Sequence, residues 1–168
     1  MIKNITIFDL DGTCIDSSHR QLTKADGTLD IANWLENATS EKVFKDSLLP
    51  LASEISKRKI AGDYTIISTA RNMTDADFEF LRINNMVPNL IISRKVGDNR
   101  PDDELKFKRL SSLFNLKQFR NANKIMFDDA NSVRATLRGL LDAVINPAKI
   151  NERLISVSYT HLRAHETV

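Results

Sequence analysis

Two carboxylates directly follow the first hydrophobic run of the sequence. Residues 2–8 (Ile-Lys-Asn-Ile-Thr-Ile-Phe) form a β-rich run, and the pentapeptide Asp-Leu-Asp-Gly-Thr occupies residues 9–13. Because Asp9 and Asp11 are two residues apart at the end of a predicted strand, their side chains should face the same side, and Gly12 lets the backbone turn sharply. The pattern predicts a site in which the two acids act together.

Further polar side chains follow two later hydrophobic runs. Residues 64–68 are followed by Thr69, Ala70 and Arg71, and residues 124–127 are followed by Asp128 and Asp129. Lys106 lies one turn into a predicted helix and offers a compact positive charge. If the runs are parallel strands, these side chains gather at the carboxyl edge of one sheet.

Attack of a carboxylate on a phosphate monoester is the reaction that these residue types fit. Two anions about 4 Å apart repel by roughly 4 kcal/mol at an effective dielectric constant of 20, so the nucleophile needs compensating cations. Mg²⁺ prefers oxygen ligands and keeps several waters, and we predict that it takes side-chain oxygens of Asp9 and Asp128 and the backbone carbonyl of Asp11. Asp129 would contact the ligands of the ion rather than the ion itself, although the choice between Asp128 and Asp129 as the direct ligand stays open.

The remaining roles follow from the same reaction. The crowding of acids is expected to raise the pKa of Asp11, which would let it protonate the leaving group and later activate water. Thr69 and Lys106 would hold the phosphate oxygens as charge spreads over them. Lys108 is the alternative to Lys106.

The rest of the sequence predicts an α/β fold that can position these groups. Strands are expected at 2–8, 64–68, 90–92, 124–127 and 143–145, and helices at 48–59, 74–85 (with Thr74 as N-cap), 102–114 and 131–138. Alternating strands and helices predict a parallel sheet of about five strands that is covered on both faces. Residues 14–47 are turn-rich and are interpreted as a lid-like insertion, too short for a separate cap domain.

The four motifs, in this order, resemble those of the haloacid dehalogenase superfamily of phosphatases over residues 3 to about 147. The resemblance implies a three-layer Rossmann-like fold, an aspartyl-phosphate on the first Asp and acid/base catalysis by the second. Residues 16–20 and 97–106 resemble the 3′-phosphatase domain of bacteriophage-type polynucleotide kinase/phosphatases, in which the stretch containing Arg100, Asp102 and Lys106 lies beside the phosphate pocket. Thr69-Ala70-Arg71 stands where that family usually has Ser-Gly-Arg.

The resemblance also implies a substrate. A nucleotide or a nucleic-acid 3′-phosphate is expected, with Gly12, Thr13, Arg71 and Arg100 as candidate substrate-binding residues. No Gly-x-x-x-x-Gly-Lys-Ser/Thr loop is present, so a kinase half is absent and a separate kinase or ligase is the expected partner. The alternatives are a small-molecule nucleotidase and a non-catalytic scaffold that binds nucleic acid or protein.

Several residues have simpler interpretations. Arg71 and Arg100 could form surface ion pairs, and His19 fits a surface loop. Asp102 and Asp103 suit a helix N-terminus, and so does the pair Asp128-Asp129. Cys14 and Arg20 have the Cys-x-x-x-x-x-Arg spacing of cysteine-dependent phosphatases, but the intervening residues contain an acid and no glycine, so we interpret the spacing as coincidence.

Length and composition bound the remaining possibilities. The 168 residues, 42% of them hydrophobic, suit one domain, and the formal charge of +2 permits a nucleic-acid substrate without indicating one. A single cysteine rules out an intrachain disulfide, and no membrane span or signal-peptide pattern is seen, so a cytoplasmic enzyme without membrane contacts is expected. Residues 156–168 resemble the translation of a transposase sequencing adapter and show no continuing periodicity, so the predicted domain is 1–155.

Overall fold

A parallel sheet lies at the centre of the computed structural model, which describes residues 1–166. The strand order is β5-β4-β1-β6-β7, and every neighbouring pair is parallel. This confirms the predicted five-stranded sheet. The strands are β1 (Asn4–Phe8), β4 (Tyr64–Ser68), β5 (Leu90–Ile92), β6 (Asn123–Phe127) and β7 (Ala143–Ile145).

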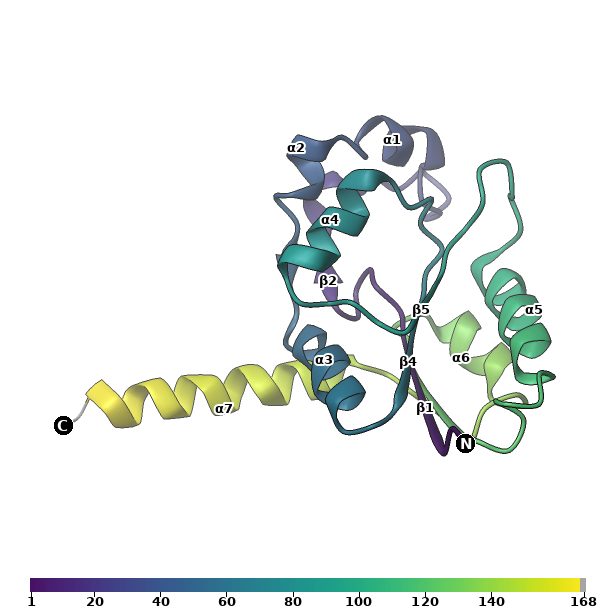
Figure 1. The fold of residues 1–168 in the computed structure, drawn as a ribbon. Helices are drawn as coiled ribbons and strands as arrows, with labels where there is room; N and C mark the ends of the chain where they lie inside the picture. Colours follow the sequence, from purple (N-terminus) through teal and green to yellow (C-terminus); the bar gives the residue numbers. More distant parts are fainter. Residues whose placement is uncertain (167–168) are drawn as a thin grey trace.

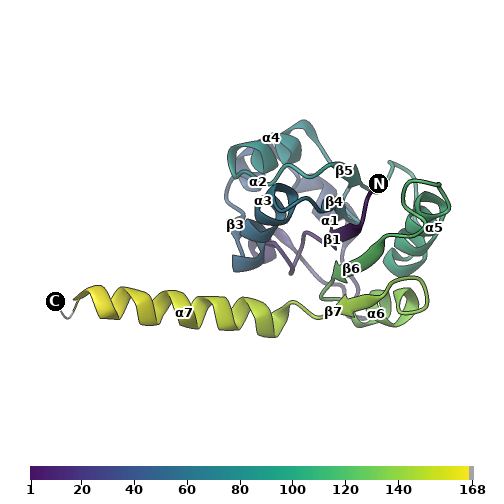
Figure 2. The same ribbon diagram turned by 60° about the horizontal axis from the view of Figure 1, so that its bottom comes forward.

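Helices cover both faces of the sheet, which confirms the three-layer fold (Figures 1 and 2). One layer holds α3 (Ser53–Ile60) and α4 (Asp75–Ile83), and the other holds α5 (Asp102–Phe114) and α6 (Asn131–Leu137). Side chains alternate along β1: Ile7 belongs to the apolar cluster that contains Leu110 of α5, whereas Phe8 belongs to the cluster that contains Ile55 of α3. The two apolar clusters hold β1 in place between the helical layers, and they therefore also position the loop that follows β1.

Helix boundaries follow local chemistry. Thr74 caps α4 as predicted, and Asp77 completes a capping box by accepting a hydrogen bond from the Thr74 backbone N–H. The helix expected at 48–59 begins later, because Leu48 belongs to a short strand and a 3-10 turn at Pro50–Ala52 precedes α3.

The polar segment after the first motif forms a small layer of its own. It starts and ends in an antiparallel pair, β2 (Ile15–Asp16) with β3 (Ser47–Leu48). Between them lie a 3-10 turn (Ser18–Arg20), α1 (Ile31–Glu36) and α2 (Ser40–Val43). Figure 1 places α1 and α2 near α4, and the rings of Phe44 and Phe80 contact each other in a tilted arrangement with centroids 6.3 Å apart.

Helix α7 (Ala148–Glu166) projects away from the body of the molecule (Figures 1 and 2). The expectation that residues 156–168 do not continue a helical pattern was wrong as far as Glu166, because extending an existing helix costs far less free energy than nucleating one. The origin of this segment stays a prediction. Among the helices of residues 1–166, none has the length and apolar character that crossing a bilayer requires.

Candidate active site

The carboxyl ends of β1 and β6 bring the first and last acidic motifs together. From β1 the chain runs to β4 and β5 on one side, and then to β6 and β7 on the other, so the connections reverse direction between β1 and β6. Such a reversal opens a crevice beyond the strand ends. Phe8 pairs with Phe127, and the Asp9 backbone N–H donates to the Phe127 carbonyl at 3.0 Å. Asp9 and Asp128 therefore lie side by side at the crevice.

Lys106 is the buried cation of this crevice. Its Nζ lies 2.9 Å from Asp9 Oδ1, 2.7 Å from Asp128 Oδ2 and 3.0 Å from Asp102 Oδ2, and the residue is 1% exposed. Burial alone would lower the pKa of Lys106, but the carboxylates of Asp9 and Asp128 outweigh it and raise that pKa. Lys108, the alternative phosphate ligand, is exposed.

Both oxygens of the candidate nucleophile have partners. Oδ1 accepts from Lys106, and Oδ2 accepts from the hydroxyl of Thr13 at 3.2 Å. Burial raises the pKa of Asp9 well above its ordinary value, with Lys106 opposing this and Asp128 adding to it. Asp128 is also buried, and its pKa is raised for the same first reason. The crevice is therefore short of positive charge.

The acids suit a magnesium ion. Asp9, Asp128 and Asp129 each offer a carboxylate oxygen, and these oxygens lie within 4.8 Å of one another. Hard divalent cations prefer anionic oxygen ligands, and these three acids supply them. Lys106 alone balances only part of their negative charge. Arg134 supports the loop from behind by donating to the carbonyls of Asp128 and Asp129 at 2.9 and 2.6 Å.

Gly12 makes room for this arrangement. Its φ is +77°, and a Cβ at this position would lie 2.2 Å from Asp129 Oδ2. Glycine is therefore required both by the backbone conformation and by the approach of Asp129. Predicted as a substrate contact, Gly12 has a clear steric role in the structure.

Asp11 is paired with Arg71 rather than crowded by acids. Arg71 Nη2 and Nε lie 2.6 and 2.8 Å from its two carboxylate oxygens, and the Ser17 hydroxyl donates to Asp11 as well. Burial opposes the charge of Asp11, but the guanidinium outweighs it and holds the pKa of Asp11 below its ordinary value. The expectation of a raised pKa was wrong, because it counted the acids nearby in sequence and overlooked the arginine.

The two predicted phosphate-binding arginines are both engaged with acids. Besides Asp11, Arg71 contacts Asp77 at 2.8 Å and Asp46 at 3.2 Å. Arg100 forms a two-pronged pair with Asp98 at 2.9 and 2.5 Å. The geometry therefore places Arg71 inside the site as a partner of acids.

The other predicted residues are placed as follows. Thr69 is buried at the end of β4 and accepts from the Arg71 backbone N–H at 3.1 Å. Asp102, at the start of α5, contacts Lys106, whereas Asp103 accepts from Thr136 at 3.0 Å. Asp102 thus joins the crevice and Asp103 does not.

The cysteine-based alternative does not fit the structure. Cys14 is fully buried, and burial raises the pKa of its thiol well above the ordinary value. A thiol in that state is not a nucleophile at neutral pH. Arg20, the other half of the spacing, is paired with Asp46.

Asp46 and Trp34, both in the insertion, were not predicted as site residues. They pack against Arg20 and Arg71. Neither has a motif around it. The only signal was a lone tryptophan in a polar segment, which identifies no partner.

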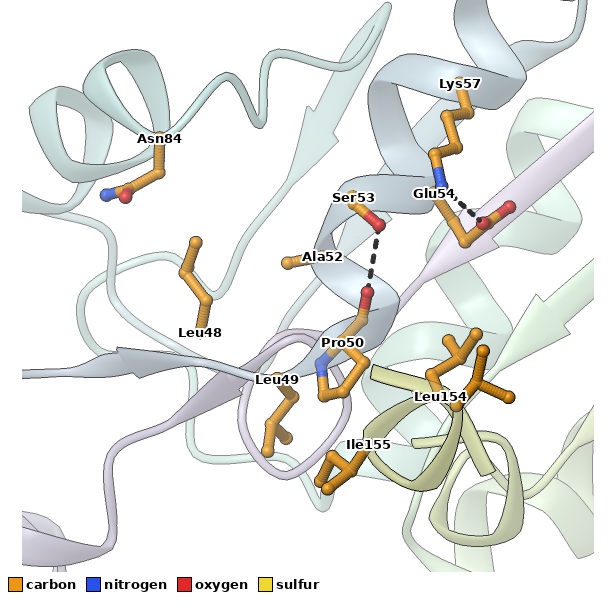
Figure 3. A pocket seen from close by; sticks show the side chains of 11 residues that line it. Leu48, Leu49, Pro50, Ala52, Ser53, Glu54, Lys57, Asn84, Leu154 and Ile155 are labelled. Atoms are coloured by element: carbon orange, nitrogen blue, oxygen red, sulfur yellow. Dashed lines mark hydrogen bonds and ion pairs between the residues drawn. The ribbon is translucent and has the colours of Figure 1, made fainter. Parts of the chain in front are cut away.

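An apolar groove of about 570 Å³ lies elsewhere (Figure 3). It runs between the Pro50–Ala52 turn, α3 and the first turns of α7, with Leu49, Pro50 and Leu154 among its lining residues. None of the predicted site residues lines it. The groove is therefore separate from the acidic crevice.

The fold and the placement of four motifs around one crevice define a haloacid dehalogenase-type hydrolase fold. Solved structures agree at the level of fold. A haloacid dehalogenase-like hydrolase from Streptococcus pneumoniae matches with TM-score 0.57 and 11% identity over 88% of this chain and 96% of that one. A haloacid dehalogenase-superfamily hydrolase of subfamily IA from Geobacter sulfurreducens matches with TM-score 0.54 and 16% identity over 85% and 88%.

The chain belongs to the family described as bacteriophage T5 5′-deoxynucleotidase, whose model matches residues 1–165. The 5′-deoxynucleotidase of Escherichia phage T5 is 35% identical over 85 residues, which are 48% of this chain and 35% of that protein. A chain in the structure of the Pnkp1/Rnl/Hen1 RNA repair complex matches with TM-score 0.56 and 22% identity, over 86% of this chain and 42% of that one. This chain thus spans less than half of both proteins.

Proposed function

We propose that this protein hydrolyses the phosphate monoester of deoxynucleoside 5′-monophosphates, with Asp9 as the nucleophile and Mg²⁺ as the cofactor. The observation that carries the proposal is the convergence of Asp9, Lys106 and Asp128 beyond two neighbouring parallel strands. The family name supports a 5′-deoxynucleotide over the nucleic-acid 3′-phosphate that the sequence left open.

The residues can carry the reaction in two steps. In the first, a carboxylate oxygen of Asp9 attacks phosphorus, the bond from phosphorus to the 5′ oxygen breaks, and Asp11 gives a proton to the departing alkoxide. Because Arg71 holds the pKa of Asp11 low in the free site, Asp11 must take up this proton from the bound monoanionic phosphate or from solvent once substrate is in place. In the second, Asp11 takes a proton from water, whose oxygen attacks the phosphorus of the aspartyl-phosphate and frees phosphate and Asp9. Lys106 neutralises part of the charge that spreads over the phosphate oxygens.

A divalent cation completes the charge balance. Asp9, Asp128 and Asp129 are the residues that would hold Mg²⁺, with Gly12 leaving space for Asp129. Bound Mg²⁺ would shield the nucleophile from the phosphate dianion and stabilise the transferring group. Lys106 alone would leave that repulsion largely uncompensated.

Phosphate release tests this function. The substrates are 3′- and 5′-deoxynucleoside monophosphates and a 3′-phosphorylated oligonucleotide, each with Mg²⁺ and with EDTA, and Asp9→Asn is the blank. Metal-dependent release from the 5′-monophosphate is the expected result. Preference for the oligonucleotide would instead support end repair together with a separate kinase or ligase. Silence on every substrate would revive the scaffold interpretation.

A further inference from the structure

Asp46 lies in the loop between α2 and β3, and its fully buried carboxylate contacts three basic side chains. Arg20 forms a bidentate pair with it, donating from Nε to Oδ1 at 2.9 Å and from Nη2 to Oδ2 at 2.8 Å. Arg71 Nη2 lies 3.2 Å from Oδ2, and His19 Nε2 lies 2.8 Å from Oδ1. The insertion therefore contributes a charged group to the interior of the site.

One atom links Asp46 to the candidate acid/base. Arg71 Nη2, which contacts Asp46, also lies 2.6 Å from Asp11 Oδ1, and Arg71 Nε lies 2.8 Å from Asp11 Oδ2. Asp77 of α4 holds the remaining edge of the guanidinium through Nη1 at 2.8 Å. A planar guanidinium held on several edges has one orientation, and it imposes that orientation on the carboxylate it grips.

The two arginines of this network are shielded from solvent. The ring of Trp34 in α1 lies under Arg20, with the guanidinium carbon 4.2 Å from the ring centroid, and the corresponding distance for Arg71 is 5.4 Å. Arg20 and Arg71 are 4% and 3% exposed. Buried charges of this kind are stable only when each keeps its partners, so loss of Asp46 would leave two arginines without a shared anion.

We propose that Asp46 is a positioning residue for the reaction: acting through Arg71, it fixes the place of the Asp11 carboxyl group beside the leaving group. The insertion is then part of the catalytic apparatus and not merely a cover over it. This inference rests on the proposed phosphatase function and deepens it.

Leaving-group dependence distinguishes positioning from simple structural support. A nucleoside 5′-alkoxide is a poor leaving group and needs a proton from a well-placed acid, whereas p-nitrophenolate departs without one. A change that misplaces Asp11 should therefore slow hydrolysis of a deoxynucleoside 5′-monophosphate much more than hydrolysis of p-nitrophenyl phosphate. A loss of folded protein slows both equally.

The experiment measures kcat and KM of the full chain on these two substrates with Mg²⁺. Asp46→Asn is compared with the parent and with Asp11→Asn, which defines the response to loss of the acid. Glu41→Gln is the matched control, because it removes a carboxylate from the same insertion whose partner is the exposed Lys45. The readout is kcat for the deoxynucleoside 5′-monophosphate divided by kcat for p-nitrophenyl phosphate. For Asp46→Asn we expect this ratio to fall by about 10- to 100-fold, as it should in Asp11→Asn, while Glu41→Gln keeps the parental ratio.

The ratio is independent of the fraction of enzyme that is folded. If Asp46→Asn yields too little protein, Arg20→Lys keeps the cation but loses the two-pronged grip on Asp46, and it should shift the ratio in the same direction. An equal loss on both substrates would overturn the inference while leaving the proposed function intact. A parent enzyme that hydrolyses neither substrate would overturn both.

Discussion

The ammonium group of Lys106 lies between the carboxylates of Asp9 and Asp128, 2.9 Å from the first and 2.7 Å from the second. The three residues come from α5 and from the ends of β1 and β6, elements far apart in the sequence. One lysine thus stabilises both the candidate nucleophile and its neighbouring acid.

Replacing Lys106 by Met should lower kcat/KM by about 100- to 1000-fold, because the transition state loses a preorganised cation. The free energy of unfolding should also fall by about 3–5 kcal/mol, since buried acids lose their counter-charge. Steady-state kinetics and urea unfolding measure the two effects. Lys108→Met, on the exposed face of the same helix, is the control, and equal kinetic losses in both variants would contradict the assignment.

Replacing Gly12 by Ala should damage the site beyond its effect on the backbone. The new methyl group would lie 2.2 Å from Asp129 Oδ2, so the carboxylate must move. Gly62→Ala is a matched control, because Gly62 also has a positive φ, of 100°, but nothing lies within 4 Å of its Cβ position. Both variants should lose about 1–2 kcal/mol of stability to the backbone conformation.

Only Gly12→Ala should also lose activity, by at least about tenfold, as expected for a misplaced ligand. Phosphate-release assays at saturating Mg²⁺, alongside thermal melting of both variants, measure the difference. Full activity in Gly12→Ala would show that the position of Asp129 does not matter.

Mg²⁺ should stabilise the folded protein without any substrate. A cation that binds only the folded state contributes about 2.7 kcal/mol at 100 times its Kd, so thermal melting should shift upward with Mg²⁺. Asp128→Asn should abolish most of this shift, whereas Asp103→Asn, at the start of α5 but bound to Thr136, should keep it. An undiminished shift in Asp128→Asn would place the ion elsewhere. The same titration with Asp129→Asn decides between the two acids as direct ligand.

Native enzyme should resist thiol alkylation. Cys14 is buried and its thiol pKa is raised, so the reactive thiolate is scarce at neutral pH and becomes available only above the ordinary thiol range or on unfolding. Iodoacetamide should leave activity unchanged in native buffer and modify one thiol per chain in denaturant, as read by mass spectrometry. Rapid inactivation of the native enzyme would restore a role for Cys14.

The sheet was predictable because its signals are local. Each strand is a short β-rich run, and α5 begins and ends at the predicted residues 102 and 114. The grouping of Asp9 with Asp128 also followed, since parallel strands present their carboxyl ends at one edge. Residues 31–36, in contrast, became α1 without a clear apolar repeat, and the Asp30 side chain caps its first turn by accepting from the Asn33 backbone N–H.

The electrostatic partners were harder to predict, because they depend on contacts across the chain. Arg71 lies 60 positions from Asp11 in sequence, yet it determines the direction of the pKa shift of that acid. Asp46 has no motif, and only the packing of the insertion brings it to Arg20 and Arg71. Sequence patterns indicated which residues lie at the crevice, but not which of them are paired with one another.

The most direct test of the central claim is a single-turnover reaction of the enzyme with a deoxynucleoside 5′-monophosphate that carries radiolabelled phosphate, quenched in acid within the first turnover. We expect acid-stable, alkali-labile label on the peptide that contains Asp9, and none in Asp9→Asn. Release of labelled phosphate with no label on the protein at any time in the first turnover would contradict this mechanism, and so would label on a peptide without Asp9.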